Sequence, residues 1–379
     1  MNFDTLCIHG CNKKYDSTGA VSVPIFQSAT FAHPGVEQST GFDYSRTLNP
    51  TREFLEKTIA NLEGGTDAIA FSTGMAAVAT LMELFSPGDH IIASDDLYGG
   101  THRLFHNISA KNGITFDYVD ASAISSIAEC IQPETKAVFI ETPTNPMMHV
   151  ADIAAAAELC KKHSLLLIVD NTFLTPYFQK PLLLGADVVV HSGTKYLGGH
   201  NDTLAGFLVV SDSTLSERLR FIYKTTGACL SPFDSWLLIR GIKTLPIRME
   251  RQQESAIKIA HWLSFQEKIK LVNYAGLPSH PGYETSRKQA SGFGAMISFE
   301  TDCRKTAHQI LEKVSVIQFA ESLGGVESLI TYPMLQTHAD ISKEEREAKG
   351  INDRLLRLSV GLESADDLIA DLTQALAEG

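Results

Sequence analysis

The chain of 379 residues has no run of apolar residues long enough to cross a membrane as a helix, which takes roughly 20 of them. Its first ten residues also lack a basic segment followed by an apolar one, the pattern that begins an export signal. These two absences predict a protein with no membrane partner. The cytoplasm is the simplest location for such a chain.

The sequence is also short of positive charge. It contains 32 Lys and Arg residues against 44 Asp and Glu residues, which gives a formal net charge of -12. A protein that binds nucleic acid neutralises phosphates with basic side chains, so this balance opposes that function. We expect no nucleic-acid partner.

Cysteine is sparse as well, with six residues spread over the chain: Cys7, Cys11, Cys130, Cys160, Cys229 and Cys303. That number is too small for a disulfide scaffold and suits a reducing compartment. Cys7 and Cys11, with His9 between them, are the one grouping that suggests a metal site. No second Cys or His pair follows at the spacing of zinc ligands, so we predict no structural metal.

What the sequence does contain is enough apolar residues, 44%, to bury the cores of two domains. Short apolar runs alternate with helical patterns between residues 67 and 210, which is typical of a mostly parallel sheet covered by helices. The predicted strands are residues 68–71, 90–93, 114–119, 137–140, 165–169, 188–190 and 207–210. The fold class predicted from this pattern is α/β.

The two ends of the chain differ from this central pattern. Residues 1–50 are rich in Gly, Ser, Thr and Pro and poor in apolar residues, so they are expected to form an arm without a core of its own. Residues 51–235 form the predicted large domain. Residues 236–379 show long amphipathic stretches and isolated strand-like runs, which predicts a smaller α+β C-terminal domain.

Polar residues follow four of the predicted strands directly, at residues 72–75, 141–146, 170–172 and 191–195. Ligands of parallel α/β sheets gather at the carboxyl ends of the strands, so these segments are the candidate site. The helix start near Gly74 offers an anion site, Asp170 suits a positively charged ring nitrogen, and Lys195 is a candidate for Schiff-base chemistry. Taken singly, the first is also consistent with plain helix capping and Asp170 with a turn residue.

The segment Ser-Gly-Thr-Lys-Tyr-Leu-Gly-Gly-His at 192–200, preceded by Val-Asp-Asn-Thr-Phe at 169–173, resembles the Cys/Met-metabolism family of pyridoxal-phosphate enzymes. The likeness covers nearly the whole chain, with further motifs at residues 19–24, 44–46, 49–52, 141–146 and 358–361. It implies a fold-type I transferase architecture. It also implies pyridoxal 5'-phosphate as the cofactor, held in the large domain.

The resemblance assigns roles to individual residues. Lys195 would carry the cofactor, Asp170 would pair with its ring nitrogen, and Tyr98 would lie against the ring, although aromatic packing alone is the other reading of Tyr98. The residues implied to hold the phosphate are Gly74, Met75, Ser192 and Thr194. Those implied to hold the substrate or the ring hydroxyl are Asn145, Arg357, Ser322 and Glu321. Without the resemblance, Arg357 would read as a surface ion pair.

Assembly is also implied by the resemblance. Members of the family are typically tetramers built from two tight dimers, and the matching Tyr44 and Arg46 would reach the phosphate of the neighbouring subunit. This contact would explain an N-terminal arm that has no core.

The implied activity is transsulfuration on cystathionine-type amino acids, by a lyase or transferase of cysteine metabolism or methionine biosynthesis. Glu321 is similar to the acidic residue of cystathionine γ-synthases and γ-lyases, which places these two reactions first. Cystathionine β-lyase is second, because related bacterial β-lyases also carry Glu there. O-acylhomoserine sulfhydrylase and methionine γ-lyase follow, the latter disfavoured by Gly100 where those enzymes have cysteine.

Three readings from other classes compete with this one. Ser192 and Lys195 also fit the Ser-x-x-Lys pattern of serine acyl-enzymes, but the serine follows a strand instead of starting a helix. A binding protein that kept the fold has no need for both Lys195 and Asp170. A metal site at His191 and His200 lacks a third ligand at suitable spacing.

Overall fold

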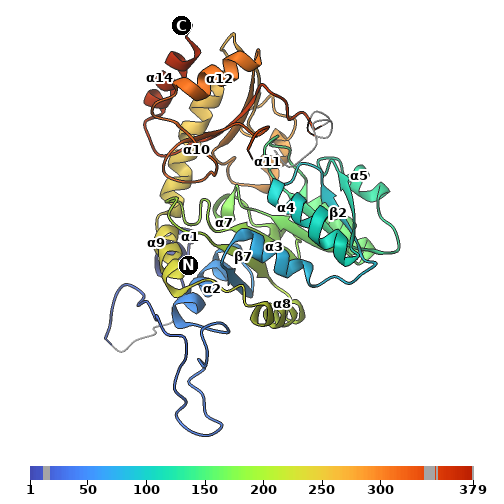
Figure 1. Ribbon diagram of the computed structural model, residues 1–379, viewed down its shortest axis with the longest axis vertical. Coiled ribbons are helices and arrows are strands. Elements are labelled where there is room, and N and C mark those ends of the chain that lie inside the picture. The colour runs from blue at the N-terminus through green and yellow to red at the C-terminus, as the bar shows by residue number, and fades with distance from the viewer. Residues whose placement is uncertain (12–17, 337–345, 347–348, 378–379) are drawn as a thin grey trace.

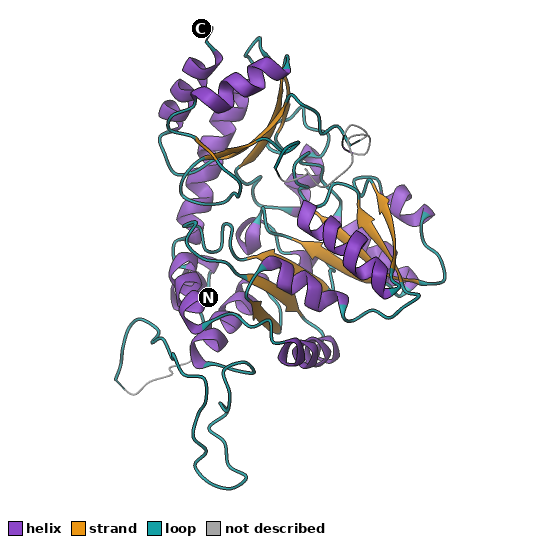
Figure 2. Cartoon of the chain, viewed as in Figure 1, coloured by secondary structure: helices purple, strands orange, loops and turns teal. Residues whose placement is uncertain are grey.

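The computed structural model describes every residue except 12–17, 337–345, 347–348 and 378–379. The described residues form a larger body around a seven-stranded sheet and a smaller part around a five-stranded sheet. Figure 2 shows the strands in these two separate groups. An extended segment near the N-terminus projects away from the body (Figure 1).

The central sheet has the strand order β1-β7-β6-β5-β4-β2-β3. All seven predicted strands are present: β1 Asp67–Phe71, β2 His90–Ser94, β3 Thr115–Val119, β4 Thr135–Glu141, β5 Leu166–Asp170, β6 Val188–Ser192 and β7 Gly206–Val210. Strand β7 is antiparallel to both of its neighbours, while the other pairings are parallel, so the prediction of a mostly parallel sheet is confirmed.

The sequence did not reveal the direction of β7, because a strand buried on both faces is apolar whichever way it runs. The connection from β6 to β7, residues 193–205, contains no helix. Parallel neighbours need a crossover, usually through a helix, so this segment returns the chain antiparallel instead. The same segment carries Lys195.

Helices cover both faces of the central sheet (Figure 1). Alternate residues of each strand enter different apolar clusters, as Ala68 and Ala70 of β1 do on one side and Ile69 and Phe71 on the other. The α-helices of this region are α2 Pro50–Glu63, α3 Gly74–Met82, α4 Gly99–Leu104, α5 Ile124–Glu129, α6 Ile153–His163, α7 Thr175–Phe178, α8 Ser213–Thr226 and α9 Pro232–Ile242. Shorter turns are a π-helix at Phe105–Ser109 and 3-10 helices at Ala110–Asn112 and Pro181–Leu184.

The smaller sheet has the order β10-β11-β12-β9-β8 and is mostly antiparallel. Its strands are β8 Ile269–Asn273, β9 Met296–Thr301, β10 Gln318–Phe319, β11 Leu329–Thr331 and β12 Leu355–Ser359, and its helices are α10 Leu245–Leu263, α11 Tyr283–Gln289, α12 Arg304–Lys313 and α14 Ala365–Leu376. The expected smaller C-terminal α+β part is therefore present. The expected boundary at residue 236 falls inside α9, and because α9 packs against α2, the packing favours a boundary after α9.

The N-terminal fifty residues are not all extended. Helix α1, Phe3–His9, packs against α2 and α10, and its Cys7 is buried. The projecting segment starts only after this helix and is tied back by Arg52, which donates hydrogen bonds to the carbonyls of Ser45 at 2.5 Å and Leu230 at 3.0 Å. None of the helices in the described part of the chain is long and apolar enough to traverse a lipid bilayer.

Candidate active site

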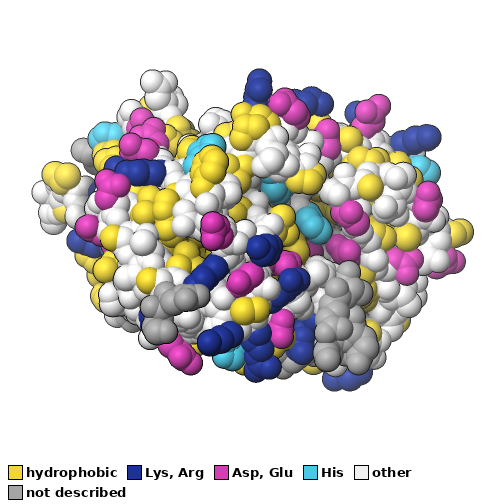
Figure 3. Space-filling model, turned by 90° about the horizontal axis from the view of Figure 1, so that it is seen from above, with side chains coloured by type: hydrophobic (Ala, Val, Ile, Leu, Met, Phe, Trp, Pro, Cys, Tyr) yellow, Lys and Arg dark blue, Asp and Glu magenta, His cyan; other side chains and the backbone are white. Residues whose placement is uncertain are grey.

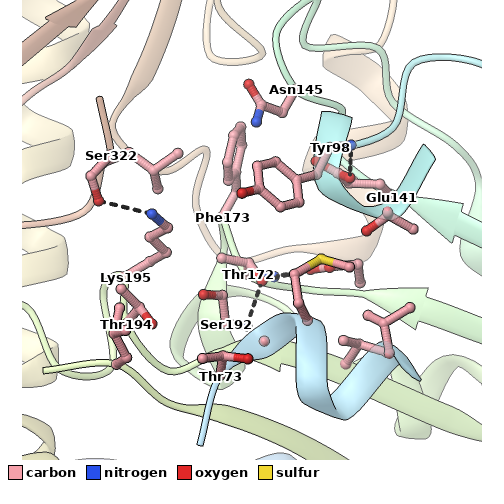
Figure 4. Close-up of a pocket in the computed structure, with 18 of the residues that line it drawn as sticks. Thr73, Tyr98, Glu141, Asn145, Thr172, Phe173, Ser192, Thr194, Lys195 and Ser322 are labelled. Carbon is pink, nitrogen blue, oxygen red and sulfur yellow. Dashed lines mark hydrogen bonds between the residues drawn. The ribbon is translucent and has the colours of Figure 1, made fainter. Parts of the chain in front are cut away.

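A cavity of about 390 Å³ opens at the carboxyl ends of β4, β5 and β6 (Figure 4). Eleven residues singled out in the sequence line it: Gly74, Met75, Tyr98, Asn145, Asp170, Ser192, Thr194, Lys195, Glu321, Ser322 and Arg357. They come from strands of both sheets and from the segments next to them. Glu321, Ser322 and Arg357 lie far from the others in the sequence. The structure thus brings together nearly all the predicted site residues.

Tyr44 and Arg46 are the exceptions, because neither is among the residues lining the cavity. Both lie on the projecting arm, where the Arg46 guanidinium sits 5.5 Å from the centre of the Tyr44 ring. Arg46 also donates a hydrogen bond to the carbonyl of Lys224. The arm therefore does not bring these two side chains into the cavity of its own chain.

Lys195 projects into the cavity from the segment between β6 and β7. Its Nζ donates a hydrogen bond to the Oγ of Ser322 at 2.8 Å (Figure 4). Burial, together with the positive charge of Arg357, lowers the pKa of Lys195 to about 8. Roughly a tenth of the amine is therefore uncharged at pH 7, far more than in an ordinary lysine with a pKa of 10.5, and the uncharged form is the one that acts as a nucleophile or base.

Ser322 adopts an unusual backbone conformation, with φ of 106°. Such a conformation is strained for a residue with a side chain and is often found where a site holds a group in place. Here the Ser322 hydroxyl accepts a hydrogen bond from the Lys195 amine, and the Ser322 carbonyl accepts one from Arg357 at 2.9 Å. One residue thus links the two cationic side chains of the cavity.

Asp170 ends strand β5 at the floor of the cavity. Its Oδ1 accepts hydrogen bonds from the N–H of Thr172 at 3.0 Å and from the Thr172 hydroxyl at 2.6 Å. Burial raises the pKa of Asp170, while the bonds from Thr172 and the nearby His191 oppose that rise. A carboxylate in this setting is best stabilised by a positive charge on a ligand.

The start of helix α3 forms one wall of the cavity. Thr73 caps the helix by accepting the N–H of Ala76 at 2.9 Å, and the N–H groups of Gly74 and Met75 have no acceptor within the helix. A Cβ at Gly74 would lie 3.1 Å from the Cβ of Ser192. The absence of this atom leaves a cup lined by N–H groups and the Ser192 hydroxyl, which suits a phosphate.

Arg357 lies on β12 and is only 1% exposed. Its guanidinium donates to Oδ1 of Asn145 at 2.7 Å and to the Thr331 hydroxyl at 3.0 Å. Its Nε has no hydrogen-bond partner among the described residues, and burial lowers its pKa to about 10. The surface ion pair considered from sequence is therefore wrong, since a buried cation with a spare donor suits a ligand carboxylate.

Tyr98 extends its ring into the cavity from the start of α4. Its N–H donates a hydrogen bond at 2.9 Å to Oε2 of Glu141, which is buried at the end of β4 (Figure 4). Burial, and then the charge of Asp170, raise the pKa of Glu141 well above its usual value. The Tyr98 ring also lies against Gly100, because a Cβ atom at that glycine would be only 2.5 Å from Cε1 of the ring.

The sequence reasoning gave no role to Glu141, Thr172 or Phe173, which also line the cavity. The signal that identified Asp170 applied to all three, because each lies at or just beyond a predicted strand end. Thr172 is the most connected of them, since its hydroxyl also accepts the N–H of Ser192 at 2.9 Å.

The two competing site readings lose support from these contacts. His191 is fully buried and bonds Glu63 at 2.8 Å, whereas His200 bonds the carbonyl of Gly198 at 2.8 Å. Across the described part of the chain, no group of three or more His, Cys, Asp and Glu side chains is arranged to hold a metal ion. Lys195 bonds Ser322 and not Ser192, which a serine acyl-enzyme would require to be activated.

A model of the Cys/Met metabolism PLP-dependent enzymes matches residues 4–377. The chain belongs to this family. The resemblance first noted in the segments around residues 170 and 195 is therefore confirmed over almost the whole chain. The family also makes the chain a pyridoxal-phosphate enzyme, as expected.

Members of the family with different named reactions are similar to this chain. The cystathionine gamma-synthase/O-acetylhomoserine (thiol)-lyase of Bacillus subtilis (strain 168) is 52% identical over 97% of this chain and 94% of its own length. The cystathionine beta-lyase of Lactococcus lactis subsp. cremoris (strain MG1363) is 49% identical over 98% of both chains. The crystal structure of cystathionine gamma-lyase from Lactobacillus plantarum complexed with L-serine superposes with a TM-score of 0.97, at 45% identity, over 99% of this chain and 98% of that one.

The cavity fits the cofactor of the family. A cup of free N–H groups at Gly74 and Met75 matches a phosphate, and Asp170 matches a protonated ring nitrogen. Lys195 supplies an amine with a lowered pKa for covalent attachment. The sequence interpretation of the fold as fold-type I is likewise confirmed by the solved relatives.

Proposed function

We propose that this enzyme acts on cystathionine-type sulfur amino acids by γ-elimination or γ-replacement, as a cystathionine γ-lyase or γ-synthase. The observation that carries the proposal is the buried Arg357, which has a spare Nε donor and lies in the same cavity as the Lys195 amine. A cation and a nucleophilic amine in one cavity suit an amino-acid substrate, whose carboxylate would bind Arg357.

Glu321 gives the proposal its preference for cystathionine. It is exposed and lines both the main cavity and an adjoining one of about 770 Å³, which also carries Asp202 and Asp234. Its carboxylate is therefore suited to the distal ammonium group of a long substrate. The alternative, a shorter amino acid, would leave this acidic side chain without a role.

The remaining assignments follow the same geometry. Gly74, Met75, Ser192 and Thr194 would hold the cofactor phosphate, and Asp170 the ring nitrogen. Asn145, already bonded to Arg357, lies where it would contact both the cofactor and the substrate carboxylate. Ser322 would orient Lys195 and the carboxylate site together.

Proton transfer is the proposed task of Lys195 and Tyr98. When bound, pyridoxal phosphate supplies an electron sink that stabilises negative charge at the α-carbon of the substrate. Lys195 Nζ, which is partly uncharged near neutral pH, would remove the α-proton. Chemistry at Cγ needs a second proton to leave Cβ, and Tyr98, whose ring points into the cavity, is the proposed partner in that transfer (Figure 4).

Cystathionine β-lyase is the second candidate. A relative with that name is 49% identical, about as similar as those named for γ-reactions, and Glu321 does not separate the two chemistries. O-acylhomoserine sulfhydrylase follows, and methionine γ-lyase last. Methionine γ-lyase is last because Gly100 stands where those enzymes resemble one another in having cysteine, and in this chain a side chain at position 100 would meet the ring of Tyr98.

Assembly and location are part of the proposal. We favour a homotetramer, a dimer of dimers in which Tyr44 and Arg46 complete the neighbouring cavity, because the arm holds both residues away from their own. The cytoplasm is favoured by six cysteines that are all free. The formal net charge of -12 opposes a nucleic-acid partner, although the face shown in Figure 3 carries both signs, with several Lys and Arg side chains gathered toward its lower middle.

The deciding experiment is to incubate the cofactor-loaded protein with L-cystathionine and identify both products by mass spectrometry. Cysteine with 2-oxobutyrate is the expected result, and O-acylhomoserine with cysteine then tests the synthase reaction. Homocysteine with pyruvate would replace the proposal with β-lyase activity. No product at all would bring the sulfhydrylase forward. Lys195→Ala should be inactive, while Lys161→Ala, exposed on α6, is the matched control.

A further inference from the structure

Two carboxyl groups lie side by side at the floor of the active site. Glu141 and Asp170 are register partners on the neighbouring parallel strands β4 and β5, and both line the cavity. Side chains in register on adjacent strands point to the same face and lie close together. Glu141 is buried and Asp170 is half-buried, and two ionised carboxylates on adjacent strands repel each other, so the pair is most stable with one proton between them.

The contacts of the two groups differ in a way that decides which one holds the proton. Asp170 receives two hydrogen bonds on Oδ1 from Thr172 and faces His191, and each of these favours its ionised form. Glu141 receives one bond, from the N–H of Tyr98, and is 5% exposed. The anion is therefore better stabilised at Asp170 than at Glu141.

The other charges around Glu141 do not reverse this preference. Asp96, which follows β2, faces it from the other side and adds a second negative neighbour, while Arg357 is the positive charge that opposes them. Arg357 is already bonded to Asn145, Ser322 and Thr331, and it is the proposed partner of a substrate carboxylate. Burial and the two neighbouring carboxyls outweigh it, which raises the pKa of Glu141.

Glu141 also determines where Tyr98 lies. The bond from the Tyr98 N–H fixes the main chain at the start of α4, which is too short a helix to hold itself in place. The ring packs over Gly100, where a Cβ would come within 2.5 Å of it and within 3.0 Å of the sulfur of Met75. Because Tyr98 is otherwise 41% exposed, this packing limits the ring on one side only, and its position depends on the main-chain bond to Glu141.

We propose that Glu141 is a positioning residue that remains protonated in the active site, so that Asp170 is the ionised member of the pair and Tyr98 is held in place by an uncharged carboxyl group. The proposal rests on the proposed function only in that Asp170 is taken to pair with the ring nitrogen of the cofactor. A protonated Glu141 would keep the negative charge on Asp170, the carboxylate that would pair with the ring nitrogen of the bound cofactor. If Glu141 were the ionised member instead, the shared proton would lie on Asp170, and Asp170 would then carry no negative charge.

The first test is spectroscopic and needs no substrate. We expect the infrared difference between wild type and Glu141→Gln, at neutral pH and with cofactor bound, to contain the carbonyl band of a protonated carboxylic acid that shifts in D2O. The same comparison with Glu134→Gln, an exposed residue before β4, should lack that band. A difference spectrum for Glu141→Gln that shows only the loss of a carboxylate would overturn the proposal.

The second test separates a neutral role from an ionic one by kinetics. Glu141→Gln keeps an uncharged oxygen that can accept the Tyr98 N–H, so its kcat should stay within roughly threefold of wild type. Glu141→Ala leaves that N–H without an acceptor and should lower kcat by roughly tenfold or more, with bound cofactor and KM little changed. Equal losses in the two variants, with cofactor absorption intact, would contradict a neutral role.

Failure of this inference is distinguishable from failure of the proposed function. Infrared and cofactor absorption report on Glu141 whatever the substrate is, and the kinetic comparison is made on whichever amino acid the wild type turns over. If Glu141→Ala does not fold, Glu141→Gln and its infrared spectrum still decide the question.

Discussion

At the scale of single residues, the amine of Lys195 shows how far a buried site changes ordinary chemistry. Its surroundings favour the uncharged form, first through burial and then through the cation of Arg357. The hydrogen bond to Ser322 holds the amine in one place without supplying a negative charge. The site thus contains an amine that loses its proton more readily than an ordinary lysine, as the proposed roles of base and nucleophile require.

This environment predicts the pH dependence of cofactor attachment. Only the uncharged amine reacts, so the rate at which cofactor-stripped protein regains its absorption should rise with pH and level off above about 8, not above the ordinary 10.5. Stopped-flow absorbance over a pH series measures the midpoint. Arg357→Gln removes a positive neighbour and should move the midpoint upward, and a wild-type midpoint near 10.5 would refute the lowered pKa.

Much of the site was predictable from the sequence, because Asp170 and Lys195 follow apolar strands and such positions meet at one edge of a parallel sheet. The family resemblance supplied Arg357 and Ser322, which no local pattern connects to Lys195. Glu141 was not given a role because its chemistry depends on neighbours in other strands. Those neighbours, Asp96 and Asp170, are distant in sequence, so the raised pKa becomes apparent only in three dimensions.

At the scale of secondary-structure elements, helix α14 holds the segment that leads into the active site. Asp371 of α14 is 4% exposed and accepts hydrogen bonds from the N–H groups of Ser315, Val316 and Ile317 at 2.9 to 3.1 Å. These residues directly precede β10, beyond which the chain reaches Ser322. Helix α14 therefore holds in place the segment that leads to Ser322, although none of the residues of α14 lines the cavity.

This anchor predicts a stability change that depends on pH. Burial alone would raise the pKa of Asp371, but the backbone N–H groups lower it overall, so the folded state favours the ionised form. Asp371→Asn should reduce the free energy of unfolding by about 2 kcal/mol at neutral pH. A lowered pKa contributes stability above the unfolded value of 3.8, so the difference from wild type should shrink as the pH falls below it.

Urea unfolding measured by circular dichroism at several pH values tests the expectation. Asp367→Asn, exposed on the same helix, is the matched control and should have little effect. A loss that is equal in the two variants, or one that does not diminish at acid pH, would contradict the role given to Asp371.

The elements differ in how well the sequence predicted them. Six strands of the central sheet are mostly buried and were found because they read as apolar runs, whereas the edge strand β3 was found although its residues are only exposed or half-buried. In the smaller sheet, the strand-like runs of the sequence lie at residues 295–300 and 355–360 and correspond to β9 and β12, but β8, β10 and β11 were missed. Strand β10 has two residues, Gln318 and Phe319, both exposed, and β8 has only exposed and half-buried residues, so neither carries the apolar signal of a buried strand.

At the scale of the whole molecule, the N-terminal arm is the feature that bears on how subunits assemble. Residues 1–50 were expected to form an arm, and the structure shows that helix α1 instead packs on the body. Sequence periodicity could not separate this short helix from the extended residues that follow it. The length of the projecting segment and the positions of Tyr44 and Arg46 remain consistent with contact to a neighbouring subunit.

A shared active site predicts that two inactive variants rescue each other. Arg46→Ala subunits keep Lys195, and Lys195→Ala subunits keep Arg46, so mixed dimers contain one cavity with both residues intact. Co-refolding the two variants should restore cystathionine turnover that neither shows alone to the same extent. Mixing wild type with Lys195→Ala controls for simple dilution, and a mixture no more active than its components would place Arg46 in its own subunit's site or outside any site.

The cavity draws its residues from two sheets, with Lys195 and Asp170 on the central one and Arg357 and Ser322 reached through the other. In the proposed assignment, the residues that attach the cofactor and most of those that recognise the amino acid, Asn145 excepted, are therefore encoded in separate stretches of the gene. Mutations in the second stretch can alter which substrate fits while the first continues to hold the cofactor. Such independence would give natural selection a short path between related reactions, and relatives that share about half their residues with this chain do carry the names of different enzymes.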